Sequence, residues 1–181
     1  MVRTSHLSPR KIACCAGLAA SLFASTLEAD EVPKIKILNA EPVGEPIAVA
    51  KGWSLQAWRE NGSDATTCVI GTGTAKQSLN LGFAEYRRLI IWDGGELTGR
   101  LEDDFANITV VLTFDGKLPL EVPDAAWEYG VLSVEASDLI EMGIVLADQL
   151  EISLSGYEGS LRFDLTNAHE AFRAGAMCMW K

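Results

Sequence analysis

The chain has 181 residues, 48% of them hydrophobic, and its 15 basic and 25 acidic residues give a formal net charge of −10. This length is enough for one domain of ordinary size that buries its own core. A strongly acidic chain without a compensating Lys/Arg cluster repels phosphate groups, so the composition excludes nucleic acid and anionic lipid surfaces as partners.

The first 29 residues have the order of features that is typical of a secretory signal peptide. Three basic residues precede an uncharged run from Ile12 to Leu27, and small residues lie around Ala24 and Ala29, before the acidic pair Asp30 and Glu31. The run is shorter and less apolar than the roughly 20 residues that a membrane anchor needs. We therefore expect cleavage near Ala29, export to the periplasm or the exterior, and a mature chain without a transmembrane segment.

Cysteine usage agrees with export. Cys14 and Cys15 leave with the leader, and Cys68 and Cys178 remain. Two cysteines in an oxidising compartment most often pair. The alternatives are two free thiols or metal ligands, although two cysteines and one histidine fall short of the usual four-ligand zinc set. A disulfide would close a loop of about 110 residues and stabilise the fold by roughly 4–5 kcal/mol.

The segment 30–51 follows the leader and holds three prolines without a steady period. This pattern predicts an extended lead-in. We expect a single β-sandwich domain over residues 52–181. The leader removes three basic residues and one acidic residue, so the net charge of the mature chain is −12.

From residue 53 onward, short apolar and β-branched runs alternate with turn residues, and Asp115-Gly116 is a strong hairpin signal. Strands are expected over residues 53–60, 66–75, 78–84, 87–93, 107–114, 118–122, 130–136, 150–156 and 160–166. Eight or so strands at this spacing predict a mainly β fold, an antiparallel β-sandwich or barrel.

Two segments break the two-residue period and predict helices. The first, near 138–148, opens with a capping-box arrangement at Ser137 and Asp138 and places Ile140, Ile144 and Ala147 on one stripe.

The second predicted helix, near 168–179, opens at Asn167. Four small residues share one of its faces: Ala171, Ala174, Gly175 and Cys178. Small residues let a helix lie close to a sheet, which a disulfide to a strand requires.

Catalytic motifs are weak. His169 is the only histidine of the mature chain, and its neighbour Glu170 does not face it on a helix. Cys178 is nine residues from His169, about 13–14 Å along a helix axis, which is too far for a Cys–His pair. The run GTGTAK at 71–76 lacks the spacing of a phosphate loop. We expect no catalytic residue and no cofactor.

The acidic connection after residue 92 is the one candidate for other chemistry. Its carboxylates are Asp93, Glu96, Glu102, Asp103 and Asp104. They could ligate calcium, which favours several oxygen ligands, or supply the acid–base pair of a hydrolase. The competing interpretation is a solvated charged face.

Two tryptophans of the first expected strand have opposite parity. Trp53 shares a face with Leu55 and Ala57, which makes it the core residue, and Trp58 is expected on the surface. An exposed tryptophan is a possible contact for a binding partner.

The order of these features resembles small, mostly uncharacterised exported proteins of Gram-negative bacteria near the invasion-associated locus B family. The likeness lies in the leader, GWSLQAW, ITVVLTFDGKLPLEV, LEISLSG and SLRFDLTNAHEAFRAGAMC. It implies a periplasmic or envelope-associated β-sandwich domain, in which Cys68 and Cys178 match the structural pair. The locus B proteins also carry a nearby cysteine pair in a mid-chain loop, which this chain lacks, and the resemblance supplies no catalytic residue.

The sequence therefore predicts an exported protein that binds a protein or another envelope ligand, or serves as a structural component. The competing hypotheses are a periplasmic hydrolase or calcium-dependent domain that uses the 93–104 region, and an inhibitor that acts through an exposed loop.

Overall fold

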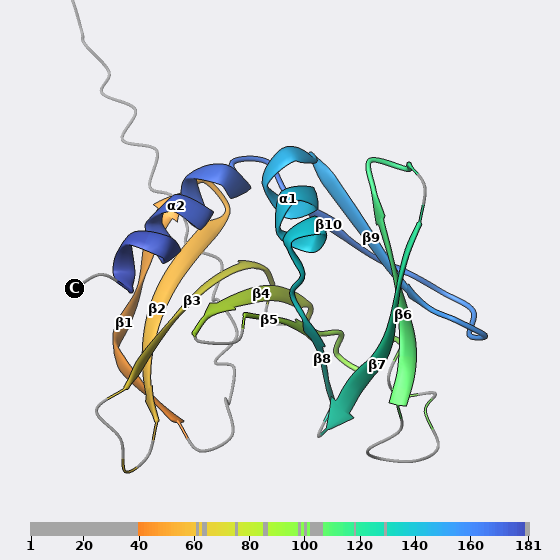
Figure 1. The fold of residues 1–181 in the computed structure, drawn as a ribbon, viewed down its shortest axis with the longest axis horizontal. Helices are drawn as coiled ribbons and strands as arrows, with labels where there is room; N and C mark the ends of the chain where they lie inside the picture. The colour runs from red at the N-terminus through yellow and green to blue at the C-terminus, as the bar shows by residue number, and fades with distance from the viewer. Residues whose placement is uncertain are drawn as a thin grey trace, which may run out of the picture.

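The computed structural model describes residues 40–60, 62, 65–74, 76–84, 87–97, 99, 101, 107–117, 119–128 and 130–179, where ten strands and two helices form (Figure 1). The strands are β1 (Ala40–Ala50), β2 (Trp53–Glu60), β3 (Thr66–Gly73), β4 (Ser78–Phe83), β5 (Arg88–Trp92), β6 (Asn107–Phe114), β7 (Leu120–Glu128), β8 (Val131–Glu135), β9 (Gln149–Leu154) and β10 (Leu161–Asp164). The helices are α1 (Asp138–Leu146) and α2 (Ala168–Cys178). The expected signal peptide lies outside the described residues.

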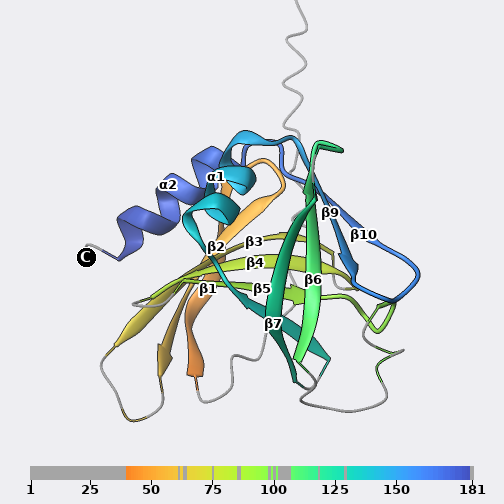
Figure 2. The same ribbon diagram turned by 45° about the vertical axis from the view of Figure 1, so that its right-hand side comes forward.

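All ten strands belong to one antiparallel sheet, in the order β1-β2-β3-β4-β5-β8-β7-β6-β9-β10. The prediction of a mainly antiparallel β fold with a central and a C-terminal helix is thereby confirmed. The sheet is not closed, because β1 and β10 stand at its two ends. The sheet bends strongly, so that β6 and β7 cross in front of β3, β4 and β5 in the view of Figure 2.

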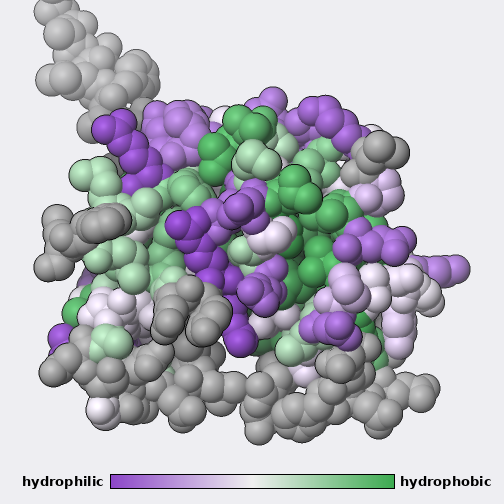
Figure 3. Space-filling view, in the orientation of Figure 1, coloured by the Kyte–Doolittle hydropathy of each residue, from purple (hydrophilic) through white to green (hydrophobic). Residues whose placement is uncertain are grey.

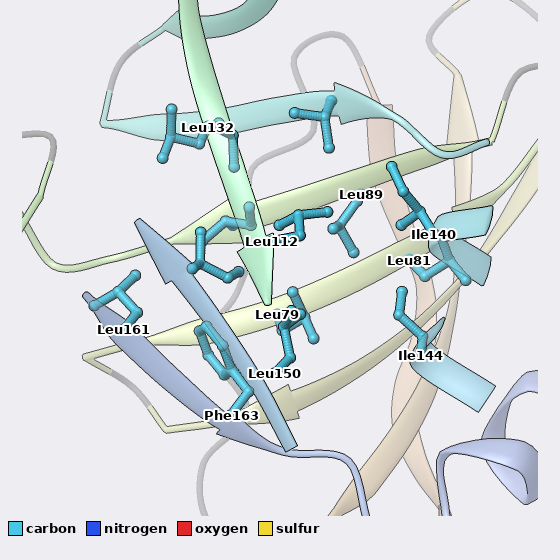
Figure 4. Close-up of a cluster of buried hydrophobic side chains, with 14 of the residues drawn as sticks. Leu79, Leu81, Leu89, Leu112, Leu132, Ile140, Ile144, Leu150, Leu161 and Phe163 are labelled. Carbon is cyan, nitrogen blue, oxygen red and sulfur yellow. The ribbon is translucent and has the colours of Figure 1, made fainter. Parts of the chain in front are cut away.

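The core fills the space inside this bend. Alternate residues of each strand point inward, as the two-residue period requires. In Figure 4, Leu79 of β4 lies beside Leu150 of β9, and Leu81 of β4 lies beside Ile140 of the helix α1; each of them is at most 1% exposed. Burying each such side chain contributes about 1.5–3 kcal/mol relative to leaving it in water.

Strand β1 lies within the segment that was expected to be an extended lead-in. It pairs with β2 from Ala40 opposite Glu60 to Ala50 opposite Trp53, with two irregularities in register. An edge strand can hold proline because one side of its backbone has no partner. The two prolines of β1, Pro42 and Pro46, concealed the strand in the sequence.

Strand β7 also runs further than expected. The sequence predicts its end at residue 122, before Pro123, yet pairing with β6 and β8 continues to Glu128. The register shifts opposite the Ile108–Val110 step of β6, and Asp124 has a left-handed backbone with φ of 57°. A β-bulge therefore absorbs the proline and lets the strand continue.

Both helices form where the sequence predicts them, and they lie side by side at one end of the sheet (Figures 1 and 2). The hydroxyl of Ser137 accepts a hydrogen bond from the N–H of Ile140 at 3.5 Å, which caps α1. Asn167 occupies the N-cap position of α2 but makes no side-chain cap, because its backbone is left-handed. Neither helix of the described residues has the length and hydropathy of a membrane span.

Helix α2 packs with its small residues against the sheet. Ala168 and Ala171 are at most 1% exposed, and a Cβ added to Gly175 would collide with the ring of Phe83. This close approach brings Cys178 to Cys68 of β3, and the two form a disulfide with a Cα–Cα distance of 6.1 Å. The predicted pair is confirmed, and it fastens the last helix to an early strand.

Candidate binding surface on helix α1

Helix α1 carries apolar residues on its exposed side as well as on its buried side, which is unusual for a surface helix. Such a helix turns an apolar stripe inward and polar residues outward. Here Ile140 and Ile144 point into the core, as predicted. The outer side carries Leu139, Met142 and Leu146, which are 62%, 50% and 78% exposed. We call these three residues the α1 face; their spacing of three and four residues places them on one side of the helix.

The one charged residue in the middle of α1 is turned inward. Glu141 is buried and forms an ion pair with the guanidinium of Arg87. That guanidinium also lies 5.7 Å from the ring centres of both Phe83 and Phe172. In the predicted capping box, Glu141 is the acidic residue three positions after Asp138. Only Ser137 caps the helix, because the carboxylate of Glu141 forms its ion pair with Arg87 instead.

Packing beneath the α1 face fixes the helix on the sheet. A Cβ added to Gly143 would lie 2.6 Å from ring carbons of Phe114, so the glycine permits close contact between α1 and β6. Figure 3 shows hydrophobic residues gathered over α1, with hydrophilic residues beside them. The α1 face is thus a fixed apolar surface on a well-packed helix.

The end of α1 is tied down by a second charged group. The carboxylate of Asp115 accepts hydrogen bonds from the N–H groups of Asp148 and Gln149, at 2.9 and 3.0 Å. These bonds, led by the one from Gln149, hold the pKa of Asp115 below its ordinary value of 3.8, and Lys117 adds to the effect. The carboxylate is therefore ionised at neutral pH and anchors the chain that leaves α1.

Covering the α1 face would release appreciable free energy. Full burial of a leucine or methionine side chain contributes about 1.5–3 kcal/mol. With the exposed fractions above, covering all three side chains is worth roughly 3–6 kcal/mol before the costs of association. Clustered exposed apolar residues of this kind mark interaction sites more often than isolated ones do.

The two described carboxylates of the acidic connection, Asp93 and Glu96, do not form a metal site or an acid–base pair. Asp93 is fully buried, and its two carboxylate oxygens accept hydrogen bonds from the N–H groups of Gly95 and Leu97 at 2.8 and 2.7 Å. Glu96 is exposed. Asp93 thus fastens its own turn. The other three candidates, Glu102, Asp103 and Asp104, lie outside the described residues.

Among the described residues, no three His, Cys, Asp or Glu side chains come together as a metal site would require.

The expectation that Trp58 lies on the surface is wrong, because this side chain is only 6% exposed. Parity assigned Trp58 to the surface, but in the sheet Trp58 has Pro42 of β1 opposite on one side and Thr67 of β3 on the other. The diagonal neighbour Val69 is buried as well. Trp58 therefore belongs to a covered part of the sheet.

The other singled-out residues hold structural or surface positions. Trp53 is buried, as predicted, and its indole N–H donates to the carbonyl of Thr166 at 3.1 Å. His169 is exposed, and its Nε2 lies 3.9 Å from Glu170. Cys178, bound in the disulfide, cannot act as a nucleophile with it.

Sequence reasoning missed the α1 face, although the signal was present. The 3.6-residue period predicts that Ile140 and Ile144 face inward, but it gives no role to the apolar residues on the outer side of the helix. Every residue of DLIEMGIVL except Asp138 and Glu141 is apolar or glycine, and a helix that is apolar all round is usually covered on all sides.

Comparisons with protein-family models, with curated proteins and with solved structures gave no match.

Proposed function

We propose that the protein is an exported binding protein of the periplasm or cell envelope, which acts through the α1 face and not by catalysis. The observation that carries this proposal is the exposure of Leu139, Met142 and Leu146 on a helix whose central charge, Glu141, is buried in an ion pair. A rigid apolar face of this kind suits a binding partner, which would bury it on association.

Export is supported by two independent features. The first 29 residues have the charge, apolar run and small residues of a signal peptide. The disulfide between Cys68 and Cys178 suits an oxidising compartment. The resemblance to envelope proteins near the invasion-associated locus B family points to the same location. Mass spectrometry of the protein recovered from cells, with and without reductant, tests cleavage near Ala29 and the pairing together.

Site-specific photocrosslinking in cells tests the binding role. A photoreactive amino acid is placed at Met142 in one strain and at Ile47 of β1 in another, since both positions are exposed and apolar. We expect a discrete crosslinked product from Met142 and none from Ile47. Products of equal yield at both positions, or none at Met142, would overturn the proposal that α1 is the binding surface.

A further inference from the structure

We propose that the partner segment seated on the α1 face is a cationic amphipathic helix, with apolar side chains along its middle and Lys or Arg at both ends. This inference rests on the proposed function and adds the chemistry of the partner. It follows from how charge is placed around the three apolar side chains.

Exposed carboxylates stand at both ends of α1. Asp138 is the first residue of the helix, and Asp148 follows the helix directly after Ala147; both carboxylates belong to exposed residues. The helix has nine residues, so the two ends are about 14 Å apart. A partner with cations at this spacing would meet a carboxylate at each end of the apolar face.

Two basic residues near α1 are paired with carboxylates of this chain. Arg87 forms the ion pair with Glu141 on the inner side of the helix. Lys117 lies 3.5 Å from the carboxylate of Asp115. Helix α1 itself has no basic residue. The field around the α1 face is therefore negative, and the net charge of the chain adds to it at long range.

The same charges argue against a second copy of this chain as the occupant. Two copies that packed α1 against α1 would bring Asp138 against Asp148 in an antiparallel arrangement, and each against itself in a parallel one. Like charges opposed in this way destabilise an interface and select against the wrong partner. An anionic lipid surface is disfavoured for the same reason.

Binding of defined peptides tests the inference. The probes are three fluorescent helical peptides with identical leucines on one face, which carry lysine, glutamate or serine at both ends. Binding is measured by fluorescence anisotropy to the disulfide-bonded protein at two salt concentrations. We expect the lysine peptide to bind at least about tenfold more tightly than the glutamate peptide, with an advantage that shrinks at high salt.

Matched variants locate the site. The triple variant Leu139→Gln, Met142→Gln, Leu146→Gln removes the apolar face, and Asp138→Asn with Asp148→Asn removes the terminal charges. The control is Val43→Gln with Ile47→Gln, which changes exposed apolar residues of β1. We expect the triple variant to weaken binding of the lysine peptide at least about tenfold, the charge variant about three- to tenfold, and the control variant to leave it unchanged.

Several results would overturn the inference. These are equal binding of the lysine and glutamate peptides, an equal loss in the control variant, binding to anionic vesicles that the triple variant abolishes, or a concentration-dependent dimer that the triple variant dissolves. If the lysine peptide fails to bind while Met142 still crosslinks in cells, the partner chemistry is wrong and the binding role stands. Unchanged thermal unfolding of each variant confirms that it is folded.

Discussion

Loss of the Cys68–Cys178 disulfide should destabilise the fold mainly through the unfolded state. The bond joins residues 110 positions apart, so it restricts most of the described chain when the protein unfolds. The chain-entropy model gives about 5 kcal/mol for a loop of this length, and removal of native disulfides typically costs about 2–5 kcal/mol. Because Cys178 is only partly buried, Cys178→Ala leaves a small cavity and reports chiefly the loss of the bond.

Denaturant unfolding, followed by tryptophan fluorescence with and without reductant, measures this loss. Cys14 and Cys15 are replaced by alanine, so that Cys68 and Cys178 are the remaining thiols. We expect reduction and Cys178→Ala to lower the free energy of unfolding by a similar amount, about 2–5 kcal/mol. In a variant that lacks both cysteines, reductant should have no effect. If the reduced and oxidised proteins unfold at the same denaturant concentration, the bond does not stabilise the fold and the reasoning is refuted.

Three further predictions concern packing and charge. Gly175→Ala should lower the free energy of unfolding by about 1–2 kcal/mol, because the added methyl group collides with the ring of Phe83 in β4. The control is Gly99→Ala, where nothing lies within 4 Å; it should change the free energy of unfolding by less than about 0.5 kcal/mol in the same denaturant titration. Arg87→Met should cost roughly 1–3 kcal/mol because it leaves the buried Glu141 carboxylate without its cation, and Glu141→Leu in the same chain should recover part of that loss in a double-mutant cycle. The pKa of Asp115 is lowered in the folded state, so its contribution to stability is present above about pH 4 and is lost as the pH falls through the folded pKa. The melting temperature of Asp115→Asn should therefore decline less steeply on acidification than that of the wild type. An equally steep decline would contradict this prediction.

Much of the fold could be predicted because period and turn chemistry are local signals. The hairpin at Asp115-Gly116, the stripe of Ile140 and Ile144, and the small face of α2 are each visible within a dozen residues. The predicted strand boundaries were wrong at β1 and β7, where prolines indicated that no strand would form or that a strand would end. An edge position in β1 and a bulge in β7 accommodate prolines, and both depend on neighbouring strands that the sequence does not display.

The apolar composition of α1 is visible in its sequence, but which of its residues face water is not. Whether Glu141 faces water depends on Arg87, which is 54 residues away in the chain and is brought to α1 by the pairing of β5 with β8, the strand that leads into the helix. The position of Trp58 was predicted wrongly because its burial depends on what lies over the outer face of β2. Parity assigned the face of the strand correctly but could not show that this face is covered.

Binding of a partner to the exposed side of α1 is tested by the position dependence of photocrosslinking in cells. The photoreactive residue is placed in turn at Leu139, Met142 and Leu146, and at the exposed apolar controls Ile47 and Met177. We predict the same crosslinked product from all three α1 positions, and its absence at both controls. A product that forms equally at the controls, or at the controls alone, would contradict the claim.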